Sequence, residues 1–90
     1  MSDFVKQLSS SLFWDVDINE IDDEKNKRFI IRRVLERGTH NDWILINKKY
    51  TLQGIVQEAM QMRYLEPKAL SYVAIMGNVP KEEFRCYKKK

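Results

Sequence analysis

The carboxylates close to the N-terminus are the first residues whose types and spacing could do chemistry. Asp15, Asp17 and Asn19 are spaced like positions one, three and five of a calcium-binding EF-hand loop, in which hard oxygen ligands hold the metal. Two requirements fail, because Glu20 stands where the loop needs glycine and Asn26 stands where a bidentate glutamate is needed. The segment therefore predicts an acidic loop and a helix start, with no metal site.

Residues suited to catalysis are few. His40 and Cys86 are the only histidine and the only cysteine of the 90-residue chain. A nucleophilic cysteine needs a base and a third group that orients the base, and a structural zinc site needs four ligands. The glycines Gly38, Gly54 and Gly77 stand alone and form no phosphate-binding loop. The sequence predicts no catalytic residue, no metal and no cofactor, and hence a protein that is not an enzyme.

Positive charge is concentrated outside the N-terminal quarter. Residues 1–24 hold seven acidic residues and one lysine, whereas residues 25–90 hold fifteen basic and six acidic residues. Clustered basic side chains can neutralise phosphates or contact an acidic protein. The same pattern is also typical of a solvated helix face with pairs such as Arg32–Glu36. Arg63 could extend this charge. The candidate partner or nucleic-acid surface consists of Lys25, Arg28, Arg32, Arg33, Arg37, Lys48 and Lys49.

A second candidate site is the apolar run Leu12, Phe13 and Trp14, taken together with Phe29. Phe29 lies outside the apolar stripe of its own helix, so another segment must cover its ring. Three consecutive large residues cannot all face one side of a helix. They either clamp over the helical core or stand exposed as anchors for a partner.

We favour the clamp, in which this segment folds back over the following helix. That movement would cover the unpaired phenylalanine and bring Asp15 and Asp17 near Arg32 or Arg33. It explains the aromatic run and the uneven charge together. On this interpretation the substitution Trp14→Ala costs about 3–5 kcal/mol of stability, as for other buried aromatic residues.

Helical periodicity dominates the elements that must position these residues, and no segment alternates with a period of two for long. The strongest pattern is a helix over residues 23–37. Asp22 or Asp23 caps its start, and Gly38 ends it in the left-handed conformation. Its buried stripe consists of Ile30, Ile31, Val34 and Leu35.

Shorter helices are predicted on both sides of this one. Asn41 and Thr51 are candidate N-caps, and Pro67 suits a first helical position. The helix that Pro67 begins is apolar almost all round, so it should be the most buried element, and Gly77-Asn78 ends it. These shorter helices are predicted over residues 3–12, 42–50, 52–62 and 67–76. An acidic loop is predicted over residues 15–21 and a last helical turn over residues 80–84.

These patterns predict an all-α protein of five or six short helices in a single domain, residues 1–90, with residues 1–11 and 88–90 frayed. No apolar run approaches the roughly 18 residues of a membrane span, and no basic segment opens the chain as in a signal peptide. A lone cysteine fits a reducing compartment. We therefore expect a cytoplasmic protein with no membrane partner.

Residues 52–76 also have the lengths of a helix-turn-helix. The second helix of that motif must display side chains that reach base edges, such as arginine or asparagine. Here it offers Lys68, Ser71 and Tyr72. The sequence therefore gives only weak support to this motif.

Several short segments form an ordered set over residues 12–87. They are Leu12-Phe13-Trp14-Asp15, Arg33-Val34-Leu35-Glu36 with Gly38, Asp42-Trp43, Tyr50, Leu65 with Lys68, and Val79-Pro80-Lys81-Glu82-Glu83-Phe84-Arg85-Cys86-Tyr87. The set resembles a family of small uncharacterised bacterial proteins, commonest in Bacteroides-like bacteria, with an LFWD signature and an IPxxxFxCY-like ending. Thr51 departs from the family pattern, in which glycine follows the tyrosine.

Members of that family are often encoded beside nucleotidyltransferase toxins of the AbiEii type. The resemblance therefore implies an antitoxin-like or regulatory partner protein, and it supplies no catalytic residues. Our leading hypothesis is a non-enzymatic helical module that binds another protein, with a toxin-type nucleotidyltransferase as the implied partner. The alternative is a DNA-binding transcriptional regulator that uses the basic helix 23–37 and the segment 52–76.

Overall fold

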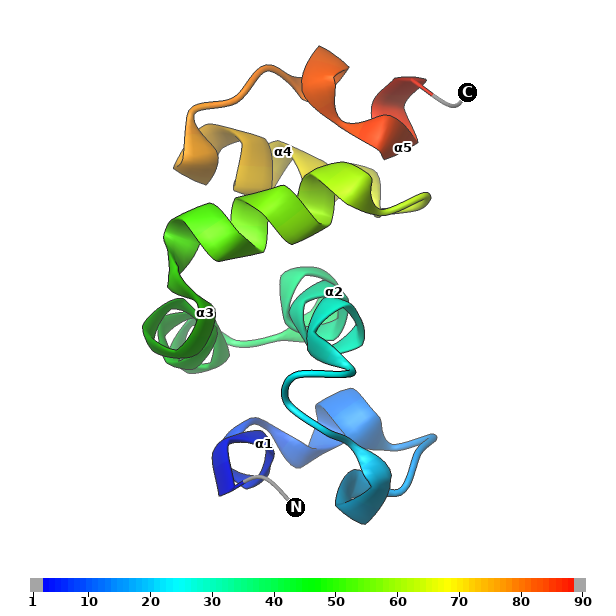
Figure 1. The fold of residues 1–90 in the computed structure, drawn as a ribbon, viewed down its shortest axis with the longest axis vertical. Helices are drawn as coiled ribbons and strands as arrows, with labels where there is room; N and C mark the ends of the chain where they lie inside the picture. Colours follow the sequence, from blue (N-terminus) through cyan, green and yellow to red (C-terminus); the bar gives the residue numbers. More distant parts are fainter. Residues whose placement is uncertain (1–2, 89–90) are drawn as a thin grey trace.

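The chain folds into helices throughout the part that the structure, a computed structural model, describes, which is residues 3–88 (Figure 1). Five α-helices, three short 3-10 helices and no strand in this range confirm the predicted all-α class. The outermost residues of the predicted frayed ends, 1–2 and 89–90, lie outside it. The elements are α1 (Asp3–Gln7), η1 (Ser10–Phe13), η2 (Ile18–Glu20), α2 (Lys27–Arg37), α3 (His40–Gln61), α4 (Pro67–Gly77), η3 (Lys81–Glu83) and α5 (Arg85–Lys88).

The helix α2 lies in the middle of the molecule, as Figure 1 shows. The N-terminal arm, which we define as residues 3–21, lies on one side of α2. The second half of α3 lies on the other side, followed by α4 and the C-terminal turns. Two segments far apart in the sequence therefore flank the same central helix.

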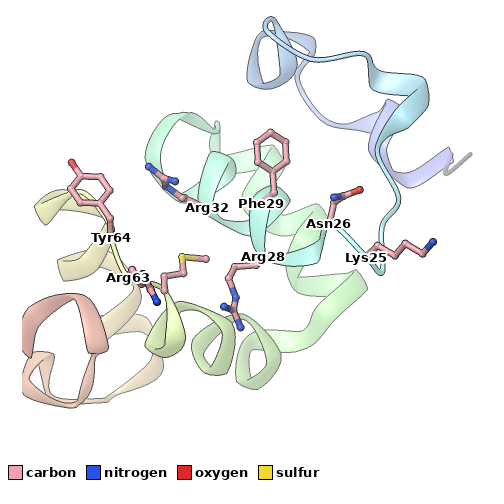
Figure 2. A pocket seen from close by; sticks show the side chains of 8 residues that line it. Lys25, Asn26, Arg28, Phe29, Arg32, Arg63 and Tyr64 are labelled. Carbon is pink, nitrogen blue, oxygen red and sulfur yellow. The ribbon is translucent and has the colours of Figure 1, made fainter. Parts of the chain in front are cut away.

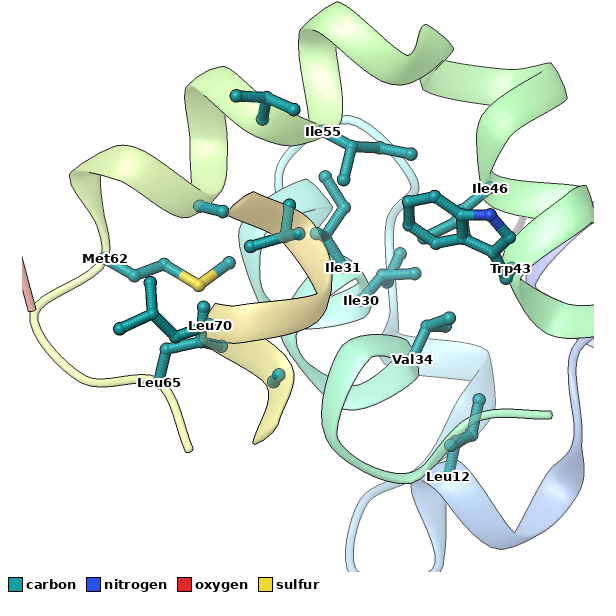
Figure 3. Close-up of a cluster of buried hydrophobic side chains, with 14 of the residues drawn as sticks. Leu12, Ile30, Ile31, Val34, Trp43, Ile46, Ile55, Met62, Leu65 and Leu70 are labelled. Atoms are coloured by element: carbon teal, nitrogen blue, oxygen red, sulfur yellow. The ribbon is translucent and has the colours of Figure 1, made fainter. Parts of the chain in front are cut away.

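The hydrophobic core follows this arrangement and extends from the arm to the C-terminal turns. Figure 3 shows its part around α2, α3 and α4. Three residues of the predicted stripe of α2, Ile30, Ile31 and Val34, are buried, and Leu35 is half-buried. Apolar side chains from the other elements pack around them. The largest fully buried apolar side chains are Phe84, Leu12, Ile30, Ile31, Ile46, Ile55, Val5 and Val73.

The predicted helix over residues 3–12 is interrupted. The helix α1 ends at Gln7, and the separate 3-10 helix η1 begins at Ser10. The interruption falls at Ser9, whose backbone N–H and hydroxyl group both donate hydrogen bonds to the carboxylate of Asp42. Because this backbone N–H is used outside the helix, the arm bends there.

The ends of α2 differ from the prediction at both termini. Asp22 accepts hydrogen bonds from the backbone N–H groups of Glu24 and Lys25, so it caps the turn before α2, which begins at Lys27. Gly38 is extended, with φ −74° and ψ 163°, and not left-handed. A Cβ atom at Gly38 would lie 2.6 Å from the carbonyl oxygen of Val34, so the position has no room for a side chain. This lack of space, and not a left-handed backbone, explains why the residue is glycine.

The helix α3 begins earlier than predicted and bends in its middle. Thr39, and not Asn41, is its N-cap, and Thr39 and Asp42 form a reciprocal capping box. The bend is at Thr51, with φ 68° and ψ 157°, so the two predicted helices meet there at a sharp kink. As predicted, Thr51 caps the second half, because its Oγ1 accepts a hydrogen bond from the backbone N–H of Gly54 at 3.2 Å.

As predicted, the helix α4 begins at Pro67 and is ended by Gly77-Asn78; the C-cap Asn78 is left-handed. The prediction that it is the most buried element is wrong. Its inner residues pack into the core, but Ile75 is 76% exposed, and Tyr72 and Met76 are also exposed. The rest of the chain covers only one side of α4.

The C-terminal turns contain more helix than predicted. Pro80 precedes the short helix η3, and α5 follows it after the fully buried Phe84. Among residues 3–88, no helix combines the length and the apolar character needed to span a bilayer.

Candidate functional site

The predicted basic residues do not form one continuous surface, because some of them serve contacts inside the molecule. Arg33 and Lys49 pair with carboxylates of the N-terminal segment. Lys25, Arg28 and Arg32 line a common hollow. Arg37 and Lys48 are exposed and form no ion pair within residues 4–87.

Arg33 holds the N-terminal arm against α2. Its Nη1 donates to the backbone carbonyl of Leu12 at 2.7 Å and to Oδ1 of Asp15 at 2.8 Å, and its Nη2 donates to Oδ2 of Asp15 at 2.8 Å. This bidentate pair lowers the pKa of Asp15 below its ordinary value. The guanidinium group also lies 4.6 Å from the centre of the Phe29 ring. Arg33 is therefore occupied within the molecule.

Lys49 and Tyr50 make a second attachment, to the segment before α2. Lys49 Nζ lies 3.0 Å from Oδ2 of Asp23, which raises the pKa of Lys49, and the Tyr50 hydroxyl donates to the backbone carbonyl of Asp23 at 2.7 Å. Burial raises the pKa of Tyr50, and the nearby carboxylates add to this effect. Phe4 of the arm packs edge-on against the Tyr50 ring, 5.6 Å away.

The aromatic run divides in a way that only partly follows the predicted clamp. Leu12 and Phe13 are buried, and the Phe13 ring lies 6.2 Å from that of Phe29. Trp14 was expected in the core, but 72% of it is exposed, so that part of the prediction is wrong. Leu12 and Phe13 occupy the inward positions of η1, and the next side chain along the turn faces solvent.

The acidic residues near this run are also divided. Asp15 reaches Arg33, as the clamp predicts, but Asp17 accepts a hydrogen bond from the backbone N–H of Asn19 in its own loop. Arg32 pairs with Glu36 at 3.4 Å and not with the arm. Within the part of the chain that the structure describes, no three acidic, histidine or cysteine side chains gather as metal ligands would.

The residue that sequence reasoning missed is Asp42, which is 1% exposed. Its carboxylate accepts hydrogen bonds from the backbone N–H of Ser9 at 2.9 Å, the Ser9 hydroxyl at 2.7 Å and the backbone N–H of Thr39 at 2.9 Å. Burial opposes the charged form, but these hydrogen bonds outweigh it and lower the pKa of Asp42. The spacing of Thr39 and Asp42 is a capping signal that could have located one half of this cluster.

Three of the predicted basic residues meet in an open hollow of about 430 Å³, which we call the basic groove. The groove runs along α2 and the connection from α3 to α4. Four cationic side chains and two aromatic rings line it, and no carboxylate does (Figure 2). These six residues are Lys25, Arg28, Phe29, Arg32, Arg63 and Tyr64.

Two cations of the groove are held in place from outside it. Arg28 donates from Nε to Glu58 and from Nη2 to Gln61, each at 2.9 Å. The guanidinium carbon of Arg32 lies 5.3 Å from the centre of the Tyr64 ring, while its Nε contacts Glu36. Lys25 and Arg63, by contrast, form no ion pair within residues 4–87.

Glu36 also fixes the connection that carries Tyr64. Its Oε2 accepts a hydrogen bond from the backbone N–H of Glu66 at 3.2 Å, in addition to the contact with Arg32. The groove therefore has a defined shape, although Tyr64 itself is 57% exposed.

The outer face of α4 is a second surface, which we define by Tyr72, Ile75 and Met76. Tyr72 packs against the buried Trp43 in a T-shaped arrangement, with ring centres 5.1 Å apart. Beside Ile75 lies an open hollow of about 370 Å³, whose lining includes Val79 and Lys81. The three exposed side chains follow a helical spacing of three and four residues, so they form one apolar face.

The remaining candidate residues do not gather. His40 lines a hollow beside Trp43 and Tyr72, whereas Cys86 lines another beside Leu65. Cys86 is half-buried, and burial raises the pKa of its thiol. A raised pKa lowers the thiolate fraction, which is the reactive form.

Comparison with known proteins yields one match. The model of a family of unknown function, DUF6922, matches residues 8–59, which run from the end of the first α-helix through most of α3. No curated protein and no solved structure shows significant similarity to the chain.

Proposed function

Because the chain belongs to DUF6922, a family of unknown function, we propose a role from its own surface: it is a non-enzymatic module that binds a second protein through the outer face of α4. The observation that carries this proposal is that α4 is apolar on both sides, while the chain covers only its inner side. A helix on the surface of a monomer normally presents polar residues to water.

The inner and outer sides of α4 have similar chemistry. The inner side carries Ala69, Leu70, Val73 and Ala74, which are buried. The outer side carries an isoleucine, a methionine and a tyrosine, which are suited to contact with another apolar surface. Single exposed apolar residues are ordinary, but three neighbours on one face of a helix favour an interface.

The surroundings of this face indicate what kind of surface would bind there. The hollow beside Ile75 can receive a protruding side chain of the partner. Lys68 lines the hollow next to Tyr72, and Lys81 lines the hollow next to Ile75. We infer a partner with an apolar patch bordered by carboxylates, because such a rim gives charge complementarity.

We take the partner to be a nucleotidyltransferase-type toxin, which makes the chain an antitoxin-like or regulatory protein. This step rests on the resemblance of the ordered segments over residues 12–87 and on the absence of any paired acid, base and nucleophile in residues 3–88 that would suggest a reaction of its own. The alternative is a DNA-binding regulator that uses the basic helix 23–37 and the segment 52–76. Its helix-turn-helix part needs polar side chains on the outer face of α4, where Tyr72, Ile75 and Met76 stand.

The proposal is tested by co-expressing the full chain with a toxin-type nucleotidyltransferase and measuring co-purification and affinity. The parent chain should bind, and Ile75→Glu should weaken binding at least tenfold, because a charge is buried at the interface. Gln57→Glu, on the exposed surface of α3, adds the same charge and should leave binding unchanged.

Trp14→Glu distinguishes the two exposed anchors. Loss of binding in Trp14→Glu but not in Ile75→Glu would move the interface to the N-terminal arm and refute the role of α4. No binding by the parent chain would exclude this class of partner. Circular dichroism and thermal unfolding establish that each variant is folded before its affinity is compared.

A further inference from the structure

We propose that the basic groove binds a short stretch of single-stranded nucleic acid, at a site separate from the outer face of α4. The groove combines the two features that such a ligand needs, which are cations for the phosphates and aromatic surfaces for unpaired bases. It is formed by the middle of the chain, whereas the protein-binding face proposed above is formed by α4.

The charge of the groove favours an anion. Lys25, Arg28, Arg32 and Arg63 line it without a carboxylate among the lining residues. Glu58 and Glu36 contact Arg28 and Arg32 from outside and orient them, which reduces the entropy that the arginines lose when they bind a ligand. Lys25 and Arg63 form no ion pair within residues 4–87 and are therefore free to contact phosphates.

The aromatic residues of the groove are arranged for stacking. Tyr64 is largely exposed, and Arg32 lies over its ring, so a planar group meets both an aromatic and a guanidinium surface there. Phe29 is fixed from the arm side by Phe13 and Arg33, so its position does not depend on a ligand. Base stacking on such side chains tolerates any base, because every base has a π face.

The shape and surroundings of the groove favour a short single strand. In Figure 2 Lys25 and Tyr64 mark opposite ends, with Arg28, Phe29 and Arg32 between them. Next to Phe29, an adjoining hollow is lined by the carboxylates of Asp17 and Glu20, which repel a continuing phosphate backbone. A duplex would keep its bases stacked inside and could not use the rings, so we infer an unpaired strand.

The test uses fluorescence anisotropy with labelled oligonucleotides of about twelve nucleotides, an ordinary footprint for single-strand sites. The probes are oligouridine RNA, oligothymidine DNA and a duplex DNA of the same length. We expect the full chain to bind the single strands more tightly than the duplex. A preference between RNA and DNA identifies the source of the strand, and either preference supports the groove.

Substitutions separate the groove from general surface charge. Arg63→Gln should weaken binding several-fold at low salt and reduce the slope of log affinity against log salt by about 0.7, the amount expected for one lost phosphate contact. Arg37→Gln is the matched control, because it removes a charge that is also exposed but lies outside the groove lining. It should change affinity much less.

Stacking is tested at Tyr64. Tyr64→Ala should weaken single-strand binding by about tenfold, whereas Tyr64→Phe keeps the ring and should bind like the parent. Because Tyr64 is exposed, neither variant should change the unfolding curve.

Three results would overturn the proposal. An equal loss of oligonucleotide affinity in Arg63→Gln and Arg37→Gln would show that binding depends on the overall surface charge and not on the groove. Tighter binding of the duplex than of the single strands would show that the groove does not contact unpaired bases. Equal affinity for an acidic peptide of about twelve glutamates, with the same loss in Arg63→Gln, would show a site for anions of any kind. The measurement needs no second protein, so its outcome is independent of the test of α4.

Discussion

The N-terminal arm and α4 both pack apolar side chains onto the central helices, but they are attached by different means. The arm is held by polar contacts at defined points, through Arg33 and Asp42. The inner side of α4 packs through small and branched apolar residues. Hydrogen bonds specify one geometry, whereas an apolar face accepts any surface that fits it. The difference supports the proposal that α4 also receives a partner, whereas the arm serves only the fold of the chain itself.

The largest expected effect separates neighbours within the arm. Phe13→Ala should lower the free energy of unfolding by about 3–5 kcal/mol, because Phe13 is buried against Phe29. Trp14→Ala should change it by less than about 0.5 kcal/mol, because the side chain is exposed. Urea unfolding followed by circular dichroism measures both values. Equal losses would mean that Trp14 packs in the core after all.

The polar attachment of the arm is tested next, at Asp42. Asp42→Asn places an amide N–H₂ group opposite hydrogen-bond donors, so we expect a loss of about 2–3 kcal/mol in the free energy of unfolding. Ser9→Ala should cost about 1 kcal/mol, since two partners remain unchanged. Ser10→Ala is the control, because Ser10 is exposed. An unchanged unfolding midpoint in Asp42→Asn would refute the polar attachment.

Acid should weaken the arm more than α4. The pKa values of Asp15 and Asp42, whose carboxylates hold the arm, are lowered in the folded protein, so their stabilising contribution is present above the unfolded pKa and is lost as pH falls through the folded values. The free energy of unfolding should therefore decline below about pH 4, near the ordinary pKa of aspartate. The decline should be smaller in Asp42→Asn. A parallel decline in both proteins would contradict the assignment to Asp42.

The smallest expected effect is a gain, at the kink that separates the two regions. The half of α3 before Thr51 contacts the arm, and the half after it packs on α4. Thr51→Gly should raise the free energy of unfolding by about 1 kcal/mol, because a positive φ with extended ψ strains a β-branched residue. Both substitutions lose the Oγ1 cap, but Thr51→Ala also keeps the strain and should be less stable than the parent. Thermal unfolding ranks the three proteins.

The sequence predicted the elements that depend on local pattern and missed those that depend on distant partners. The stripe of α2 and the stop at Asn78 follow from periodicity and turn chemistry, and they are present. The attachment of Asp15 to Arg33 was predictable because a short acidic loop joins them. The break at Ser9 was not predictable, because its cause is a carboxylate in another helix.

The candidate sites show the same limit. Periodicity identifies α4 as apolar, but it cannot say which side of the helix the rest of the chain covers. The sequence therefore predicted a buried position for Ile75, which is exposed. Seven basic residues were predicted to share one surface, yet only Lys25, Arg28 and Arg32 line the groove, together with Arg63 from the connection between α3 and α4. Tyr64 was missed as a groove residue, because it lies in a connection with no periodic pattern.

The contact between Ser9 and Asp42 has a consequence for the order in which the molecule assembles. The two residues are separated by 33 positions, whereas the capping box that holds Asp42 spans only three. Closing the short loop costs far less entropy and turns the carboxylate toward its place before the arm arrives. We therefore expect the arm to dock last and to open first. Such an opening would expose Leu12 and Phe13 to solvent while α2, α3 and α4 keep their packing.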